Sequence, residues 1–119
     1  MKPVRIKIIS ILSLLILVAT VGCRASVQNG ETASGSNTTV NVSAQEFSLS
    51  LSTSQAAPGL VTFSVRNEGH LPHDFALYGN GVEEKTPTIQ PGETATLEVS
   101  LEAGSYTYVC TVQGHAMLG

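Results

Sequence analysis

The chain has 119 residues, with six basic and nine acidic side chains and a formal net charge of −3. All nine acidic residues follow position 23, but only three of the basic ones do, so this part of the chain carries a net charge of −6. Because no basic stripe is present to neutralise phosphates, the sequence argues against nucleic acid as a partner. An acidic balance of this size is compatible with plain solubility or with a basic protein partner.

Residues 1–22 have the profile of a signal peptide. A short basic stretch, 1–7, is followed by fifteen residues without a charge, 8–22, and small residues lie at the exit. The uncharged run is shorter than the roughly 20 residues that a helix needs to span a bilayer core, although a retained transmembrane anchor stays the alternative. We therefore expect residues 1–22 to be removed during export.

The residues VATVGC, 18–23, resemble the lipobox of bacterial lipoproteins, in which a small residue precedes the cysteine that is acylated. Thr20 departs from that family, which more often has leucine there. The resemblance implies cleavage between Gly22 and Cys23 and several acyl chains on Cys23, which together would hold the protein on a membrane. It also implies an extracytoplasmic location, in the periplasm or at the cell surface.

Residues 23–38 are expected to form the lipidated N-terminus and a flexible linker. The stretch 24–38 is rich in Ser, Gly, Asn and Thr and has almost nothing to bury. By random-coil scaling it reaches about 20 Å, which is enough to let a small domain tumble near a membrane. The folded domain is then expected over 39–119, where the length allows one modest core and no second domain.

The domain reads as strands throughout. Apolar and polar side chains alternate in several short segments, and compositions typical of turns, such as APG, NEG, GNG and QPGE, separate them. The segments expected as strands are 47–52, 60–67, 73–78, 94–101 and 105–110. This pattern predicts an all-β sandwich or barrel, and the lack of a strong helical period argues against a βαβ enzyme core.

The alternation along these strands also places candidate metal ligands. His73 has the same parity as Phe75, and Cys110 has the same parity as Tyr108, so each lies at the end of an apolar face. In a sandwich both could emerge at the same end, with His115 following across a short loop. Two imidazoles and one thiolate that converge in this way form the ligand set of a blue-copper site.

Cys110 has two other interpretations, as half of a disulfide bond and as a catalytic nucleophile. Two cysteines in an exported chain suggest a disulfide, but Cys23 lies at the predicted processing site. An exposed thiol in an oxidising compartment is a liability unless something such as a metal holds it. As a catalytic nucleophile beside His115, Cys110 would lack a helix start or an orienting partner to lower its pKa. Other catalytic motifs are also absent from the sequence, so we do not expect an enzyme.

The segment 58–119 resembles a cupredoxin, the plastocyanin-like or amicyanin-like family of small blue copper proteins. The resemblance rests on NEGHLPHDF at 67–75 together with GSYTYVCTVQGH at 104–115. It implies a Greek-key β-sandwich and one type 1 copper ion. By position, His73 is similar to the family's first imidazole ligand, Cys110 to the thiolate ligand and His115 to the exposed second imidazole.

The same resemblance implies a function. The protein would carry single electrons between redox proteins such as cytochromes or oxidases, acting as a monomer. A copper-binding storage or delivery protein without a role in electron transfer is the alternative, because it would share the ligands. A third interpretation is an immunoglobulin-like adhesion module that holds no metal.

The family's axial methionine is expected in the spacing H-x-x-x-x-M, which would fall directly after Gly119. A final strand normally follows that methionine, so we expect a C-terminally truncated domain that lacks its last strand. Met117 is a candidate axial ligand, and its alternative role is in an apolar rim around the exposed imidazole of His115, where a redox partner would dock.

Several neighbours have less specific roles. We expect His70 in a surface loop and 83–85 in a solvated loop. Asp74 is a candidate to orient its loop or the imidazole of His73. Asn67 resembles the family asparagine beside the first histidine, and it would tie the two ligand loops together or serve a turn.

Overall fold

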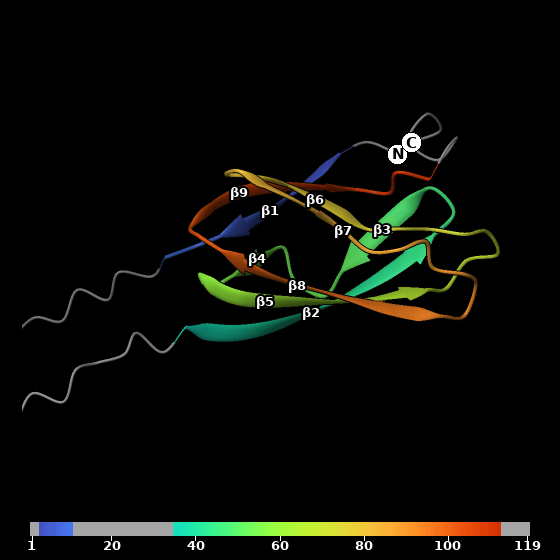
Figure 1. Cartoon of the computed structure of the whole chain (residues 1–119), viewed down its shortest axis with the longest axis horizontal. Coiled ribbons are helices and arrows are strands. Elements are labelled where there is room, and N and C mark those ends of the chain that lie inside the picture. Colours follow the sequence, from blue (N-terminus) through green and yellow to red (C-terminus); the bar gives the residue numbers. More distant parts are fainter. Residues whose placement is uncertain (1–2, 11–34, 113–119) are drawn as a thin grey trace, which may run out of the picture.

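The computed structural model of the chain describes residues 3–10 and 35–112. Within these ranges the regular secondary structure consists of β-strands alone, and the strands form two sheets that face each other (Figure 1). The all-β sandwich expected from the sequence is therefore confirmed. No helix among the described residues is long and apolar enough to cross a membrane.

One sheet has four strands, in the spatial order β3, β2, β5, β8. Their bounds are Ser48–Leu51 for β3, Ser36–Gln45 for β2, Gly59–Asn67 for β5 and Thr94–Leu101 for β8. Strand β2 pairs parallel with β5, and β3 and β8 pair antiparallel with β2 and β5. The inward residues of β5 alternate with residues that are only partly covered, as expected for a strand with one buried face.

Strand β2 is not among the segments expected from the sequence. It includes residues 36–38, which the composition of the sequence assigns to the linker. Its buried positions, Val40, Val42 and Ala44, do alternate with Thr, Asn and Ser, but the apolar side chains are few and small. The apolar pattern of β2 is too weak to predict a strand by itself. The strand pairs parallel with β5, and its apolar side chains are buried in that setting.

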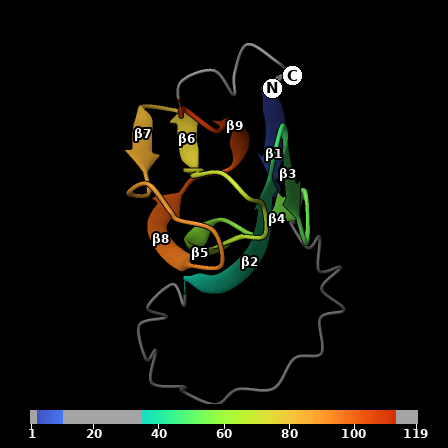
Figure 2. The same ribbon diagram turned by 90° about the vertical axis from the view of Figure 1, so that its right-hand side faces the viewer.

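The other sheet has five strands, in the spatial order β4, β1, β9, β6, β7. Their bounds are Gln55–Ala56 for β4, Val4–Ile8 for β1, Gly104–Val109 for β9, Ala76–Gly79 for β6 and Val82–Lys85 for β7. Figure 2, which looks along the sandwich, shows β6, β7 and β9 in one layer and β2, β5 and β8 in the other.

Strand β7 corrects the expectation of a solvated loop at 83–85. It forms a hairpin with β6 through the two-residue turn Asn80-Gly81, where both residues have positive φ, 46° and 78°. That geometry is the hairpin turn that Asn-Gly favours. Residues 83–85 are exposed as expected, and their charges suit an edge strand, since charged edges discourage pairing with other chains.

Strand β1 is formed by residues that the sequence assigns to the leader. It pairs antiparallel with β9 and parallel with β4, so it lies inside the sheet. Ile6 and Ile8 are buried, whereas Arg5 and Lys7 on the other face are exposed. Pairing with β1 thus satisfies the backbone groups along one edge of β9. Whether residues 1–22 are removed during export stays a prediction.

The core lies between the two sheets. It is built from the inward residues of nearly every strand, and three aromatic rings form its centre. Phe75 lies 5.0 Å from Phe63 and 5.8 Å from Tyr108 between ring centroids, so it joins the four-stranded sheet to β9. Phe75 is two residues after His73. The packing of its ring in the core therefore fixes the chain segment next to the candidate site.

Candidate metal centre

His73 lies in the connection between β5 and β6, and its side chain is completely buried. It does not begin a strand as expected, because β6 begins at Ala76. Instead, its backbone forms an isolated two-bond bridge with Ile89, in which His73 N donates at 3.1 Å and Ile89 N donates at 2.7 Å. Both the backbone N–H and the backbone C=O of His73 are thus hydrogen-bonded.

Asn67, at the end of β5, fixes the start of the same connection. Its amide Nδ2 donates to the carbonyl oxygens of Leu71 and Ile89, both at 2.8 Å, and its Oδ1 accepts from Gly69 N at 2.9 Å. Asn67 is completely buried. It serves the turn that it begins and also ties that turn to Ile89, the residue that bridges His73.

Cys110 follows β9 directly, and its side chain is completely buried. The expected alternation is confirmed here, because Tyr106 and Tyr108 are buried while Thr107 and Val109 are only partly covered. Burial raises the pKa of the Cys110 thiol, although the backbone N–H groups of Asp74 and Val112 act in the opposite direction.

Asp74 connects the two candidate ligands. Its backbone N donates to the Sγ of Cys110 at 3.5 Å. Its carboxylate accepts from the backbone N of Thr111 at 2.5 Å and from the Thr111 hydroxyl. Asp74 therefore orients the chain directly after Cys110, and its role in orienting the His73 ring stays a prediction.

The His73 ring and the Cys110 thiol meet at one end of the sandwich. His73 Nδ1 lies 3.7 Å from Cys110 Sγ, and both groups are buried. Two ligands at metal distances of about 2.1 Å for nitrogen and about 2.3 Å for sulfur are about 3.7 Å apart when they subtend about 115° at the ion. The pair therefore fits two positions of a metal site with imidazole and thiolate ligands.

The remaining predicted site residues lie outside the described ranges. These are His115, Met117 and Cys23. Within 3–10 and 35–112 no group of three or more His, Cys, Asp and Glu side chains is suited to a metal. The structure thus brings together His73 and Cys110, and the third and fourth ligands stay predictions.

Glu46 is a residue of the site that the sequence did not single out. It lies in the turn between β2 and β3, and its Oε1 is 3.4 Å from His73 Nε2. Twenty-seven residues separate it from the histidine, and no motif links them, so only the fold brings them together. His70, in contrast, is exposed as expected, with 97% of its side chain accessible and its Nδ1 3.8 Å from Glu46 Oε2.

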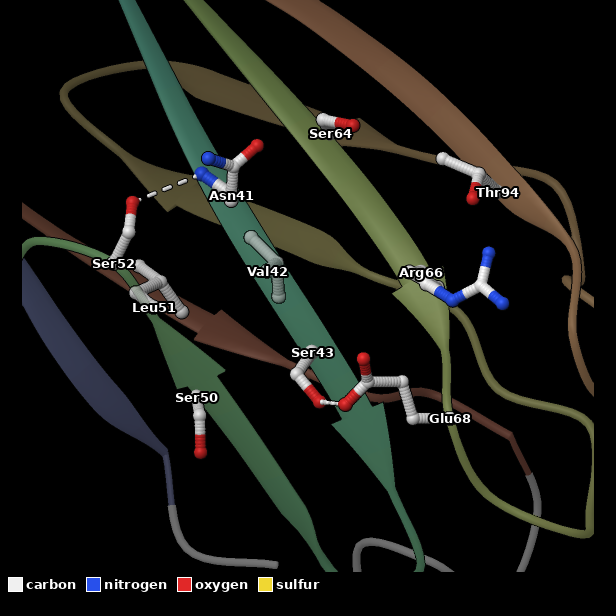
Figure 3. A pocket seen from close by; sticks show the side chains of 10 residues that line it. All are labelled: Asn41, Val42, Ser43, Ser50, Leu51, Ser52, Ser64, Arg66, Glu68 and Thr94. Carbon is white, nitrogen blue, oxygen red and sulfur yellow. Dashed lines mark hydrogen bonds between the residues drawn. The ribbon is translucent and has the colours of Figure 1, made fainter.

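A shallow hollow marks the outer face of the four-stranded sheet (Figure 3). Its lining is mostly hydroxyl and amide side chains from all four strands and from the residue after β3, with Arg66 and Glu68 at one end. Neither His73 nor Cys110 lines it. The hollow therefore has no part in the candidate metal centre.

Comparison with known families gives one match. The model of the cupredoxin-like domain matches residues 12–119, which leaves strand β1 outside the matched segment. No curated protein and no solved structure matches the chain. The family match covers nearly the whole chain and agrees with the β-sandwich, and it includes the buried His73–Cys110 pair. The chain belongs to the cupredoxin-like family.

Proposed function

We propose that the protein is a type 1 copper protein that carries single electrons between redox partners. The observation that carries the proposal is the buried pair of His73 Nδ1 and Cys110 Sγ, 3.7 Å apart at one end of a cupredoxin-like sandwich. His115 would complete the trigonal set, and Met117 is the candidate for a weak axial contact. A bound copper ion would supply a one-electron couple between Cu(I) and Cu(II).

The chain's own residues would fix the site before copper arrives. Asn67 and Ile89 hold the backbone around His73, and Asp74 holds the residue after Cys110. A site whose ligands are fixed by the fold changes little between the two oxidation states of the ion. A small rearrangement favours rapid electron exchange, and nothing in this proposal requires a catalytic reaction.

The proposal includes a location and partners. Acylation of Cys23 would anchor the domain outside the cytoplasm, in the periplasm or at the cell surface. A cytochrome or an oxidase would then exchange electrons with the monomeric domain near the imidazole of His115, which the family resemblance predicts to be exposed. The acidic surface after position 23 is compatible with a partner that carries a basic face.

The test is the visible and EPR spectrum of the full chain after addition of Cu(II). We expect an intense blue thiolate-to-copper band and a narrow copper hyperfine splitting, both lost in Cys110→Ser. The matched control is Cys23→Ser, which removes the other cysteine and should keep both signals. The absence of the band from the unmodified chain, or its survival in Cys110→Ser, would overturn the copper assignment.

A second measurement separates electron transfer from copper storage or delivery. We expect a reversible redox wave and slow loss of copper to a chelator. A blue protein that loses copper rapidly and exchanges no electrons with a cytochrome would support the storage or delivery function instead.

A further inference from the structure

The His73 ring has two distinct sides. Its Nδ1 faces Cys110, and its Nε2 faces the carboxylate of Glu46 at 3.4 Å. A neutral imidazole carries a proton on only one nitrogen, so a metal at Nδ1 requires that proton to be on Nε2. The group that faces Nε2 therefore decides how readily Nδ1 is presented to a metal.

Glu46 is itself held in place. Its Oε1 accepts from the backbone N of His70 at 2.6 Å and from that of Leu71 at 2.7 Å. These two donors belong to the connection that leads into His73, so the carboxylate closes a ring with that connection. Two backbone N–H donors at these distances favour the carboxylate form of the Glu46 side chain and hold it beside the His73 ring.

The turn that carries Glu46 has an uncommon backbone geometry and little free space around the carboxylate. Phe47, the next residue, has φ 68°, which is uncommon for a bulky side chain. Gly69 lies against the carboxylate, and a Cβ built there would come within 2.8 Å of the Glu46 Cδ. Position 69 therefore leaves room for Glu46 only because it is glycine.

We propose that Glu46 is a positioning residue for the metal centre, which holds the His73 ring with its proton on Nε2 and its Nδ1 open to the metal. The contact resembles the carboxylate–histidine pairs that orient metal-bound imidazoles in general. Here the carboxylate comes from a separate hairpin, so the turn between β2 and β3 becomes part of the site. The inference rests on the proposed function, because it assumes that His73 binds a metal.

The first test needs no metal. Histidine-selective ¹⁵N NMR of the full chain reports which ring nitrogen carries the proton, with His73 assigned from a His73→Gln variant. We expect the Nε2-protonated form in the unmodified chain and in Glu68→Gln, a control that removes a carboxylate bonded to Ser43 instead. In Glu46→Ala we expect a mixture of the two tautomers. An unchanged Nε2-protonated form in Glu46→Ala would overturn the inference.

The second test uses copper. Competition with a chelator should show that Glu46→Ala weakens copper binding by about 10- to 100-fold, the range typical of partners that orient a ligand. Glu46→Gln keeps the length and one acceptor oxygen, so we expect it to recover part of the loss. Because a nearby negative charge favours the more positive oxidation state, both variants should raise the reduction potential.

The outcomes distinguish the two proposals. If the unmodified chain gives no blue copper signal, the proposed function fails, while the NMR result still tests the contact between Glu46 and His73. If the signal is present and Glu46→Ala matches Glu68→Gln in both affinity and potential, the positioning role fails and the proposed function stands. Loss of affinity with an unchanged tautomer and potential would indicate only a structural role and would also contradict the inference.

Discussion

The two sheets of this sandwich differ in how they are completed. The four-stranded sheet is built entirely from segments within the matched family region, and most of its buried side chains come from β2, β5 and β8. The five-stranded sheet contains β9, which leads directly to Cys110, and it is completed by β1 from outside that region. The sheet that leads to Cys110 therefore depends on β1, a segment that the sequence assigns to a leader.

Removal of β1 is the strongest test of this difference. A chain that begins at Ala25 loses the burial of Ile6 and Ile8, each of which contributes about 1.5–3 kcal/mol when fully buried. We expect its free energy of unfolding to fall by about 3–6 kcal/mol in urea denaturation, with the backbone groups at the edges of β9 and β4 left for water. Equal stability of the long and short chains would show that β1 does not support the sheet.

A core substitution in the other sheet provides the comparison. Phe63 of β5 is completely buried and packs against Phe75, the aromatic residue two positions after His73. Phe63→Ala should cost about 3–5 kcal/mol through lost burial and a cavity, measured by the same denaturation. Because Phe63 belongs to the sheet that needs no outside strand, this cost should be present in both the long and the short chain. A cost confined to the long chain would mean that the four-stranded sheet also depends on β1.

A smaller effect on the outer face of the four-stranded sheet depends on pH. The hydroxyl of Ser43 donates to Glu68 (Figure 3), and this bond lowers the pKa of Glu68 from its usual 4.5, with partial desolvation opposing it. A lowered pKa in the folded state contributes stability above pH 4.5 that is lost as the pH falls through the lowered value. Ser43→Ala should therefore reduce the loss of melting temperature on acidification below pH 4.5. An identical pH profile in the variant would contradict this prediction.

The sequence predicted those parts of the fold in which one strand carries its own strong pattern. Strands β5, β8 and β9 and the buried position of Cys110 follow from alternating apolar side chains. Strand β2 was missed because its apolar residues are small, and β7 because an edge strand of charged residues has no buried face to reveal it.

The residues of the candidate site also differ in whether the local sequence predicts their role. Each of His73 and Cys110 could be located from its own neighbours along the chain, and the structure brings them together. The roles of Asp74 and Glu46 depend on contacts between segments 27 or more positions apart, and residue type alone does not reveal such contacts. Strand β1 has the alternation of a strand, but its basic start and the apolar run after it are also the pattern of a leader, so local sequence supports both.

Strand β1 also has a consequence for the number of molecules that make up the folded domain. If the predicted cleavage after Gly22 occurs once the chain has folded, residues 3–10 become part of a separate peptide, whose described residues contact the domain through strand pairing and two buried side chains. Folding then turns from a one-chain into a two-component equilibrium, so stability depends on the concentration of the released peptide. Dilution alone would favour its loss, and the vacated position between β9 and β4 would accept another extended segment with the same alternation.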